Sequence, residues 1–491
     1  MIDPSMAAGT IVFIPCWESG HFMSMIAAGK RMLDAAAGAL SLTVLVMRAP
    51  TAAKASEVEA HVRREAASGL DIRFLNLPAV EPSTGGFVAS EEFNFRYTQR
   101  HAPHVEEAIA GLAPTPVAAL VVDLFCTPLL DVAADLAAVP RYVYFASTAA
   151  FLALMLRLPA FRDDLAARLK GKEGTAHVPG LPAVPLRYMP ACLSRDKIGN
   201  YDWFADYGRR FMDARGIVIN SSVELEGGVL DAIADGRCVP GRPAPAVHAI
   251  GPVIWFAARE QQQQQTHVCV QWLDAQPAGS VVFLCFGSKG FVDTAQVAEV
   301  AAGLERSGHR FLWVLRGPPS AGSSHPTDAD LDAMLPGGFL ERTQGRGLVW
   351  PAWAPQKEVL AHPAVGGFVS HCGWNSALES LWFGVPMAPW PLYGEQHLNA
   401  FELVREMGVA VQLKDMEASE VGYFVEAAEL ERAVRGLMGG TEEGRKAREK
   451  AAEMKAACRK TVEEGGSSHA ALRKLMSEIT AGGGAPSRLA V

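Results

Sequence analysis

Short, almost uninterrupted apolar runs alternate with longer amphipathic segments along most of the chain. The first half carries such runs at residues 11–16, 41–47, 72–77, 119–123, 141–145 and 216–220, and the second half at residues 280–287, 310–315, 347–351, 365–371, 385–390 and 409–413. Strands that are buried on both faces lack polar alternation, and the intervening segments are long enough for crossover helices. The pattern therefore predicts an α/β fold with parallel sheets covered by helices on both faces.

The length and one polar segment predict how the chain divides. A chain of 491 residues is long enough for two or three domains. Residues 250–268 combine a Gly-Pro turn signal with five consecutive glutamines, which is typical of a solvated linker. We therefore expect an N-terminal domain over residues 1–250, a linker over 251–267, a C-terminal domain over 268–461 and a flexible tail over 483–491. Each domain is expected to be a doubly wound parallel sheet, with a ligand in the cleft between them.

Charge, hydropathy and cysteine usage exclude several classes of protein. The formal net charge of −8 provides no basic surface for nucleic acid or anionic lipid. No apolar run reaches the ~18 residues that span a bilayer, and the first residues do not read as a secretory leader. Eight cysteines are dispersed without a CxxC pair, which favours reduced thiols over disulfides or zinc ligation. We expect a cytoplasmic monomer that neither binds nucleic acid nor inserts stably into membranes.

One strand–loop–helix segment of the C-terminal half has the features of a diphosphate site. Neither GxGxxG nor GxxxxGK[ST] occurs, which argues against a nicotinamide-dependent dehydrogenase and against a P-loop protein. Asn375 or Ser376 is placed to cap the start of this helix, and Gly384 is placed to end it. The unpaired N–H groups of a helix start suit a diphosphate without any lysine. Gly373 allows a close backbone approach and His371 can add a hydrogen bond, although the segment alone also fits an ordinary strand-to-helix turn.

Residues on either side of this segment fit other parts of a nucleotide ligand. Trp353 stands between two prolines after an apolar run, where it can either stack on a flat base or pack between domains. Glu379 follows Asn375 by four residues on the same helical face, and its carboxylate can accept hydrogen bonds from ribose hydroxyls. Glu395 and Gln396 follow another apolar run, where polar side chains can bind sugar hydroxyls.

The run from Trp353 to Gln396 resembles, over its full length, the signature box of plant secondary-product UDP-glycosyltransferases. Residues 335–348, before the box, add to the resemblance. It implies the GT-B fold, in which two Rossmann-like domains face each other across a cleft, with the acceptor bound by the first domain and the UDP-sugar by the second. It also implies that a last helix, at about residues 462–482, packs back on the first domain. UDP-glucose would be a donor substrate, and no cofactor is expected.

The same resemblance implies a role for each residue of the donor site. Trp353 would stack on uracil, the backbone of Ala354 would pair with it, and Gln356 would reach the uridine. Glu379 would hold the ribose. The residues that would hold the diphosphate are Ser288, His371, Trp374 (through its backbone), Asn375 and Ser376.

The sugar is expected to be glucose. By the resemblance, Glu395 and Gln396 bind its hydroxyl groups, and Ser147 or the neighbouring Thr148 meets them from the first domain. Trp374 resembles the residue of glucose users rather than that of glucuronate users. Gln396 likewise favours glucose over galactose.

Sugar transfer to a hydroxyl group requires a general base. A histidine with a carboxylate behind it suits this role near neutral pH. His21 is expected in the loop after the first strand and Asp123 ends the run 119–123, so the two can lie at one sheet edge; from spacing alone, both can equally cap helices. The resemblance matches its catalytic histidine and aspartate to these positions and implies one in-line displacement with inversion. The proline that often follows the family's histidine is missing here, which puts the local geometry of the helix start in doubt.

An Asp328-Ala329-Asp330 triplet resembles the DxD motif that holds a metal-bound diphosphate in a different glycosyltransferase fold. Its surroundings favour a solvated helix start instead. We expect no metal site and metal-independent transfer.

The acceptor is expected to be a small hydrophobic molecule, such as a flavonoid or another phenol. Aromatic and apolar side chains in or near loops of the first domain can line its pocket, although such side chains lie more often in a core. They are Trp17, Phe22, Phe87, Phe93, Phe125 and Met189. Transfer to a ring carbon, giving a C-glucoside, is one alternative. A UDP-sugar-binding protein without catalysis is another, against which His21 and Asp123 argue.

Overall fold

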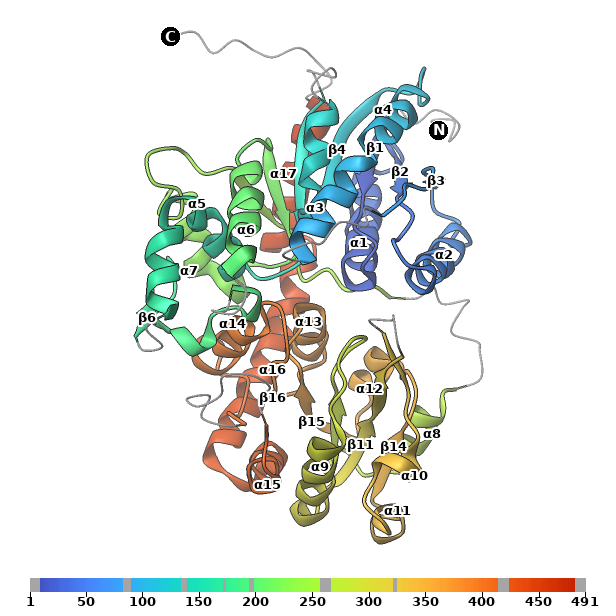
Figure 1. The fold of residues 1–491 in the computed structure, drawn as a ribbon, viewed down its shortest axis with the longest axis vertical. Helices are drawn as coiled ribbons and strands as arrows, with labels where there is room; N and C mark the ends of the chain where they lie inside the picture. The colour runs from blue at the N-terminus through green and yellow to red at the C-terminus, as the bar shows by residue number, and fades with distance from the viewer. Residues whose placement is uncertain are drawn as a thin grey trace.

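The computed structural model describes residues 9–82, 90–133, 139–170, 174–193, 198–256, 266–320, 325–413 and 424–481. Two α/β domains lie one above the other along the long axis of the molecule (Figure 1). The N-terminal domain is coloured blue to green and the C-terminal domain yellow to orange. Phe87, the tail over 483–491 and the glutamines of the linker lie outside the described residues.

The sheet of the N-terminal domain has seven strands in the order β3-β2-β1-β4-β5-β8-β9, and all its neighbours pair in parallel. Their bounds are Thr10–Ile14 (β1), Ser41–Val46 (β2), Ile72–Asn76 (β3), Val117–Asp123 (β4), Arg141–Phe145 (β5), Gly216–Ile219 (β8) and Ala246–Ala249 (β9). The strand order reverses direction between β1 and β4. The carboxyl ends of these two strands therefore form a switch point, where ligands bind in open α/β sheets.

Helices cover both faces of this sheet, and β1 is buried throughout because of this cover. The helices are α1 (Ser19–Ala36), α2 (Ala52–Ala66), α3 (Ser90–Arg100), α4 (Ala102–Ala110), α5 (Ala149–Lys170), α6 (Ile198–Phe211) and α7 (Val223–Ala234). Shorter elements are η1 (Leu124–Ala133), η2 (Leu186–Tyr188), η3 (Ala191–Leu193) and an antiparallel pair of β6 (Thr175–Ala176) and β7 (Val184–Pro185).

The sheet of the C-terminal domain has five parallel strands in the order β14-β11-β10-β15-β16. Their bounds are Val281–Cys285 (β10), Arg310–Val314 (β11), Gly347–Trp350 (β14), Val365–Ser370 (β15) and Met387–Pro389 (β16). The strand predicted over 409–413 is wrong, because only Ala410 pairs there, in an isolated bridge to Met387. A π-helical turn, η6 (Glu402–Glu406), precedes this stretch. The apolar run arises because Val409, Val411 and Leu413 are buried in the core although they do not form a strand.

Helices also flank the second sheet. They are α8 (Val268–Asp274), α9 (Thr294–Ser307), α10 (Leu331–Met334), α11 (Phe339–Arg342), α12 (Gln356–Ala361), α13 (Trp374–Phe383), α14 (Gln396–Phe401), α15 (Ala427–Arg435), the π-turn η7 (Gly436–Gly440) and α16 (Glu442–Val462). An antiparallel pair, β12 (Arg316–Pro319) and β13 (Pro326–Asp328), lies beside them. Asp330 caps α10 by accepting a hydrogen bond from the N–H of Ala333 at 3.2 Å, and Asp328 pairs with Arg316 at 3.5 Å. The DxD triplet thus lies at a helix start.

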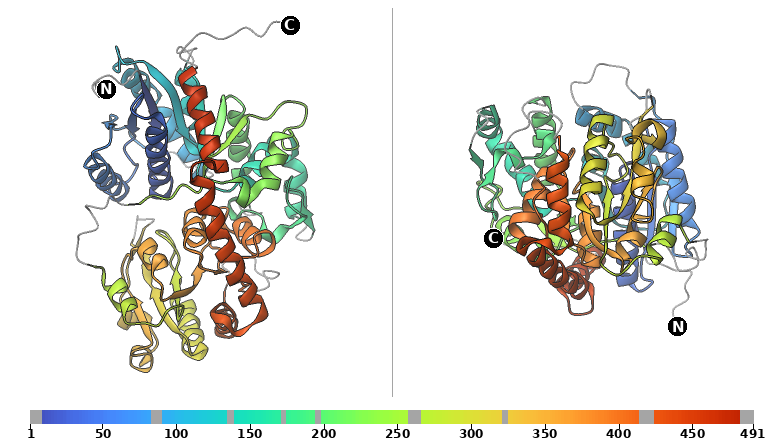
Figure 2. Two further views of the ribbon diagram at one scale, coloured as in Figure 1. Left: turned by 180° about the vertical axis from the view of Figure 1, so that it is seen from behind. Right: turned by 90° about the horizontal axis from the view of Figure 1, so that it is seen from below.

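The last described helix, α17 (Ser467–Ala481), returns to the N-terminal domain and packs on β9, α1 and β4 (Figure 2). Its buried residues, Leu472, Leu475, Met476 and Ile479, join the core of that domain. Among the described residues, no helix has the length and apolarity that a bilayer crossing requires.

Candidate active site

His21 and Asp123 meet at the switch point of the N-terminal sheet. Asp123 is the last residue of β4, and His21 lies in the first turn of α1 rather than in the loop before it. The predicted loop is shorter than expected, because α1 already begins at Ser19, with Glu18 as its N-cap residue. His21 Nδ1 and Asp123 Oδ2 are 2.9 Å apart, and no side chain caps the start of α1. Asp123 does cap the start of η1, through its other carboxylate oxygen.

The environment of this pair fixes its protonation. Asp123 is fully buried, and its Oδ1 accepts the N–H of Phe125 at 3.0 Å. A carboxylate only accepts hydrogen bonds, so the proton of neutral His21 lies on Nδ1 and Nε2 keeps its lone pair. Burial favours the neutral imidazole, but the adjacent Asp123 carboxylate outweighs it and raises the pKa of His21 above its ordinary value. The side chain of His21 is 26% exposed, so a ligand can reach it.

A cavity of about 460 Å³ opens between the two domains. Six of the predicted donor-site residues line it, namely Ser288, Trp353, Ala354, Gln356, Ser376 and Glu379. The N-terminal domain contributes Met23, His61 and Arg64. Its volume falls within the range of small-molecule sites.

Trp353 and Glu379 both line this cavity. The indole of Trp353 is 64% exposed, which argues against packing between domains and leaves a flat face for a ligand. Gln356 Nε2 donates to Glu379 Oε2 at 2.7 Å and to Ser376 Oγ at 2.9 Å, so one amide orients both. Burial raises the pKa of Glu379 to about 7, although nearby Lys357 opposes the shift. Hydrogen bonds from ligand hydroxyl groups to the Glu379 carboxylate would therefore stabilise its ionised form.

The start of α13 differs from the prediction in one respect. Gly373 is the N-cap residue, and no side chain caps the helix. Asn375 and Ser376 lie inside the first turn, and Asn375 Nδ2 instead donates to the backbone oxygen of Gly20 at 2.9 Å. The helix ends at Gly384 with φ 77°, as predicted. The N–H groups of the first turn thus retain their capacity to bind an anion.

His371 lies against this helix start in a tightly enclosed place. A Cβ atom at Gly287 or Gly373 would lie 2.6 or 2.5 Å from its ring, so only glycine fits at these two positions. Burial lowers the pKa of His371 to about 4, which keeps the ring neutral. Its buried Nδ1 has no hydrogen-bond partner among the described residues. An unpaired polar atom beside free N–H groups fits a ligand that accepts or donates hydrogen bonds.

The two domains also meet at Ser147 and Glu395. Ser147 Oγ donates to Glu395 Oε1 at 3.0 Å, which brings together two residues predicted to bind the sugar. Gln396 is almost completely buried, and its Oε1 accepts the N–H groups of Leu392 and Tyr393 at 2.9 and 3.0 Å. Gln396 thus holds the loop before α14 in place through hydrogen bonds that its side-chain carbonyl oxygen accepts.

Comparisons with known proteins show the family of this chain. The family model described as UDP-glucoronosyl and UDP-glucosyl transferase matches residues 247–432. Over 480 residues, which are 96% of this chain and 98% of the relative, the sequence is 57% identical to a malvidin galactosylase of Oryza sativa subsp. indica. The chain belongs to the UDP-glucoronosyl and UDP-glucosyl transferase family. It is therefore a UDP-glycosyltransferase.

Further relatives and solved structures resemble this UDP-glycosyltransferase over nearly its whole length. A flavonol 3-O-glucosyltransferase of Arabidopsis thaliana is 38% identical, covering 96% of this chain and 97% of that protein. A glycosyltransferase from Siraitia grosvenorii in complex with UDP superposes with a TM-score of 0.82 at 37% identity, covering 96% of this chain and 99% of that one. A Medicago truncatula protein complexed with UDP-glucose gives 0.80 at 34% identity, covering 96% and 98%. The GT-B fold predicted from the sequence is confirmed.

The cavity of the glycosyltransferase contains cations that the sequence does not predict. Arg64, Arg316 and Lys357 line it, although the helix start was expected to suffice without positive charge. They come from α2, β12 and α12, elements far apart in the sequence, so no local motif reveals Arg64 or Arg316. Lys357 directly follows Gln356, a predicted site residue, so its place in the cavity could have been inferred from the sequence.

Trp374 also has a role that the sequence did not reveal. Its buried indole donates from Nε1 to the backbone oxygen of Asn220 at 2.7 Å, across the domain boundary. The residue was predicted to act through its backbone, and its side chain in addition joins the two domains.

The residues predicted for the acceptor pocket fall into two groups. The ring of Phe125 lies 5.3 Å from that of His21, and Phe93 stacks on Tyr97 at 5.5 Å. Trp17, Phe22 and Met189 are buried, and Phe22 packs on His61 as part of the core. Phe125 is therefore the aromatic side chain best placed beside the base.

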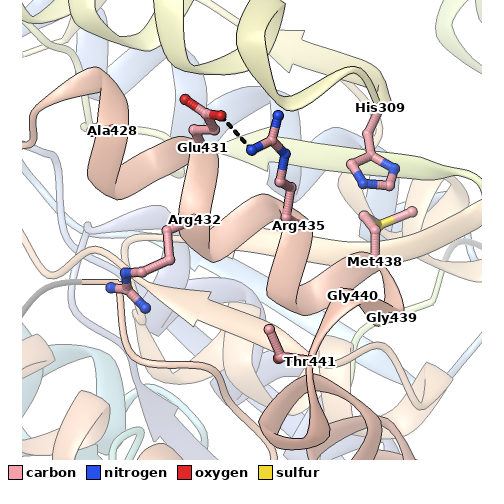
Figure 3. A pocket seen from close by; sticks show the side chains of 9 residues that line it. All are labelled: His309, Ala428, Glu431, Arg432, Arg435, Met438, Gly439, Gly440 and Thr441. Atoms are coloured by element: carbon pink, nitrogen blue, oxygen red, sulfur yellow. Dashed lines mark ion pairs between the residues drawn. The ribbon is translucent and has the colours of Figure 1, made fainter.

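A second hollow, of about 800 Å³, lies in the C-terminal domain beside α15 and η7 (Figure 3). None of the predicted site residues lines it. Its two arginines are engaged, because Arg435 pairs with Glu431 at 2.5 Å and Arg432 donates to the backbone oxygen of Leu413 at 2.5 Å. This hollow therefore offers no ready anion site.

Proposed function

We propose that the enzyme transfers glucose from UDP-glucose to a hydroxyl group of a flavonoid or anthocyanidin, with inversion at the anomeric carbon. The contact between His21 and Asp123 at the switch point of the N-terminal sheet carries this proposal, and the predicted donor residues that line the cavity between the domains support it. The names of its relatives support the acceptor class, since they include a malvidin galactosylase and a flavonol 3-O-glucosyltransferase.

In the proposed reaction, Nε2 of His21 takes the proton of the acceptor hydroxyl as its oxygen attacks the anomeric carbon. The bond between that carbon and the diphosphate oxygen breaks on the opposite side, and UDP leaves with the electron pair. Asp123 stabilises the imidazolium that forms, without becoming protonated. The start of α13 and neutral His371 bind the departing diphosphate.

Galactose is a second candidate for the transferred sugar. The relative that is 57% identical is named a galactosylase, whereas Gln396 and Trp374 favour glucose by family resemblance. Initial rates with UDP-glucose and UDP-galactose at equal concentration decide between them. A rate with UDP-galactose that exceeds the rate with UDP-glucose would overturn the glucose proposal.

The decisive experiment incubates the purified chain with each UDP-sugar and a panel of flavonols, anthocyanidins, terpenoids and plant hormones. Mass spectrometry identifies the products, and acid hydrolysis separates O-glycosides from C-glucosides, which survive it. We expect O-glycosides of flavonoids, formed at an unchanged rate after a chelator is added. UDP binding without transfer to any acceptor would favour a nucleotide-sugar-binding protein instead.

A further inference from the structure

Trp255 lies in the segment that joins the two domains and lines the same cavity as Trp353 and Glu379. The indole is only half-buried, although it contacts both domains. In Figure 1, α2 of the N-terminal domain and α12 of the C-terminal domain lie on the two sides of the boundary that this segment crosses. The segment therefore takes part in the donor cavity as well as linking the domains.

Contacts from both sides hold the Trp255 ring in place. From α2, buried Glu65 accepts the indole N–H through Oε1 at 2.8 Å, and Glu65 also pairs with Lys30. From α12, Lys357 Nζ donates to the backbone oxygen of Trp255 at 2.5 Å and lies 3.9 Å from the ring centroid. The position of the ring is thus fixed by hydrogen bonds and charge before any ligand arrives.

A second cation, the guanidinium of Arg64, lies 5.2 Å from the same ring centroid. Both cations themselves line the cavity. A fixed aromatic ring beside two positive charges suits a ligand that combines a flat base with phosphate groups. A nucleoside diphosphate has this chemistry, and Glu379 and Gln356 in the same cavity suit its ribose.

We propose that Trp255, supported by Arg64 and Lys357, forms a second wall of the nucleotide site and contacts the uridine of the donor. The inference rests on the proposed function, because it takes a UDP-sugar as the ligand of this cavity. It makes the interdomain segment a binding element, so that nucleotide affinity depends on residues of both domains and of the segment between them.

The test compares three variants of the full chain by calorimetric titration with UDP and UMP. Trp255→Leu keeps apolar volume but removes the flat ring, and should weaken binding of both nucleotides on the order of tenfold. Trp255→Phe keeps a flat ring without the N–H group and should restore most of the affinity. Trp203→Leu is the matched control, because Trp203 is also a half-buried tryptophan beside an arginine, Arg96 at 5.8 Å, and does not line the cavity. Its affinity should equal that of the wild type.

The outcomes separate this inference from the proposed function. Unchanged UDP affinity in Trp255→Leu, with tight binding by the wild type, would refute the second wall and leave the proposed function standing. Equal weakening in the Leu and Phe variants would also refute it, because the bond to Glu65 rather than the ring would then govern binding. No UDP binding by the wild type would contradict the proposed function itself. Thermal unfolding of each variant verifies that it is folded.

Discussion

Two buried carboxyl groups meet where the domains join, and they make the stability of the enzyme depend on pH. Glu226 of α7 is 5% exposed and Glu402 of η6 is 1% exposed. Glu226 accepts the N–H of Ala150 at 2.9 Å and the hydroxyl of Ser221 at 2.5 Å, so it is the ionised member. Burial, followed by the nearby charge of Glu226, raises the pKa of Glu402 well above its ordinary value, and Glu402 donates its proton to Glu226.

The size of the effect follows from counting protons. A glutamate in the unfolded chain loses its proton near pH 4.3, so between that pH and the raised pKa of Glu402 the folded chain holds about one proton more than the unfolded chain. The stability from this pair is therefore complete below about pH 4.3 and is lost as pH rises through the raised pKa of Glu402. One proton corresponds to a fall of about 1.4 kcal/mol in the free energy of unfolding per pH unit. Glu406, four residues farther on, carries a further negative charge that raises the same pKa.

Glu402→Gln tests this reasoning, because glutamine still donates a hydrogen bond but does not titrate. We expect the variant to match the wild type near pH 4.5 and to gain stability over it as pH rises, by up to about 1.4 kcal/mol per pH unit until the raised pKa of Glu402 is passed. Urea unfolding, followed by tryptophan fluorescence at several pH values, measures the difference. Glu464→Gln, at an exposed position in the turn before α17, is the control and should retain the wild-type slope. Parallel pH profiles for Glu402→Gln and the wild type would refute the assigned protonation.

Three further predictions concern the reaction. His21→Ala should abolish transfer, while calorimetry should show an unchanged UDP affinity. Asp123→Asn should lower kcat on the order of 10²- to 10⁴-fold. Wild-type turnover in either variant would contradict the assigned base. Because the pKa of Glu379 is about 7 and its ionised form is the better acceptor for ribose hydroxyls, UDP affinity should rise from pH 6 to pH 8 in the wild type but stay flat in Glu379→Gln. Ser147→Ala loses the 3.0 Å hydrogen bond to Glu395 and should reduce kcat/KM for the UDP-sugar about tenfold. Steady-state kinetics measure this ratio, and a wild-type kcat/KM in the variant would disprove the prediction.

Local patterns predicted the strands and the helix ends because those depend on near neighbours. The long apolar runs became parallel strands because burial on both faces removes polar alternation. Gly384 ends α13 because it alone tolerates a positive φ there without strain. The same local rules failed at 409–413, where apolar residues serve the core without a full strand partner, and at Asn375, whose amide turns to Gly20 of the other domain.

The sequence by itself determined the two parallel-sheet domains, since their strands rest on residues that are close in the chain. Its resemblance to UDP-glycosyltransferases implied the GT-B arrangement and indicated the segment proposed to bind the donor. Only the tertiary structure decided which residues of the two domains come into contact. It brought Trp255, Arg64 and Lys357 into one cavity and set Glu226 against Glu402. Such pairs are separated by up to hundreds of residues, and their contact energies depend on burial and distance after folding. No periodicity or local motif records them.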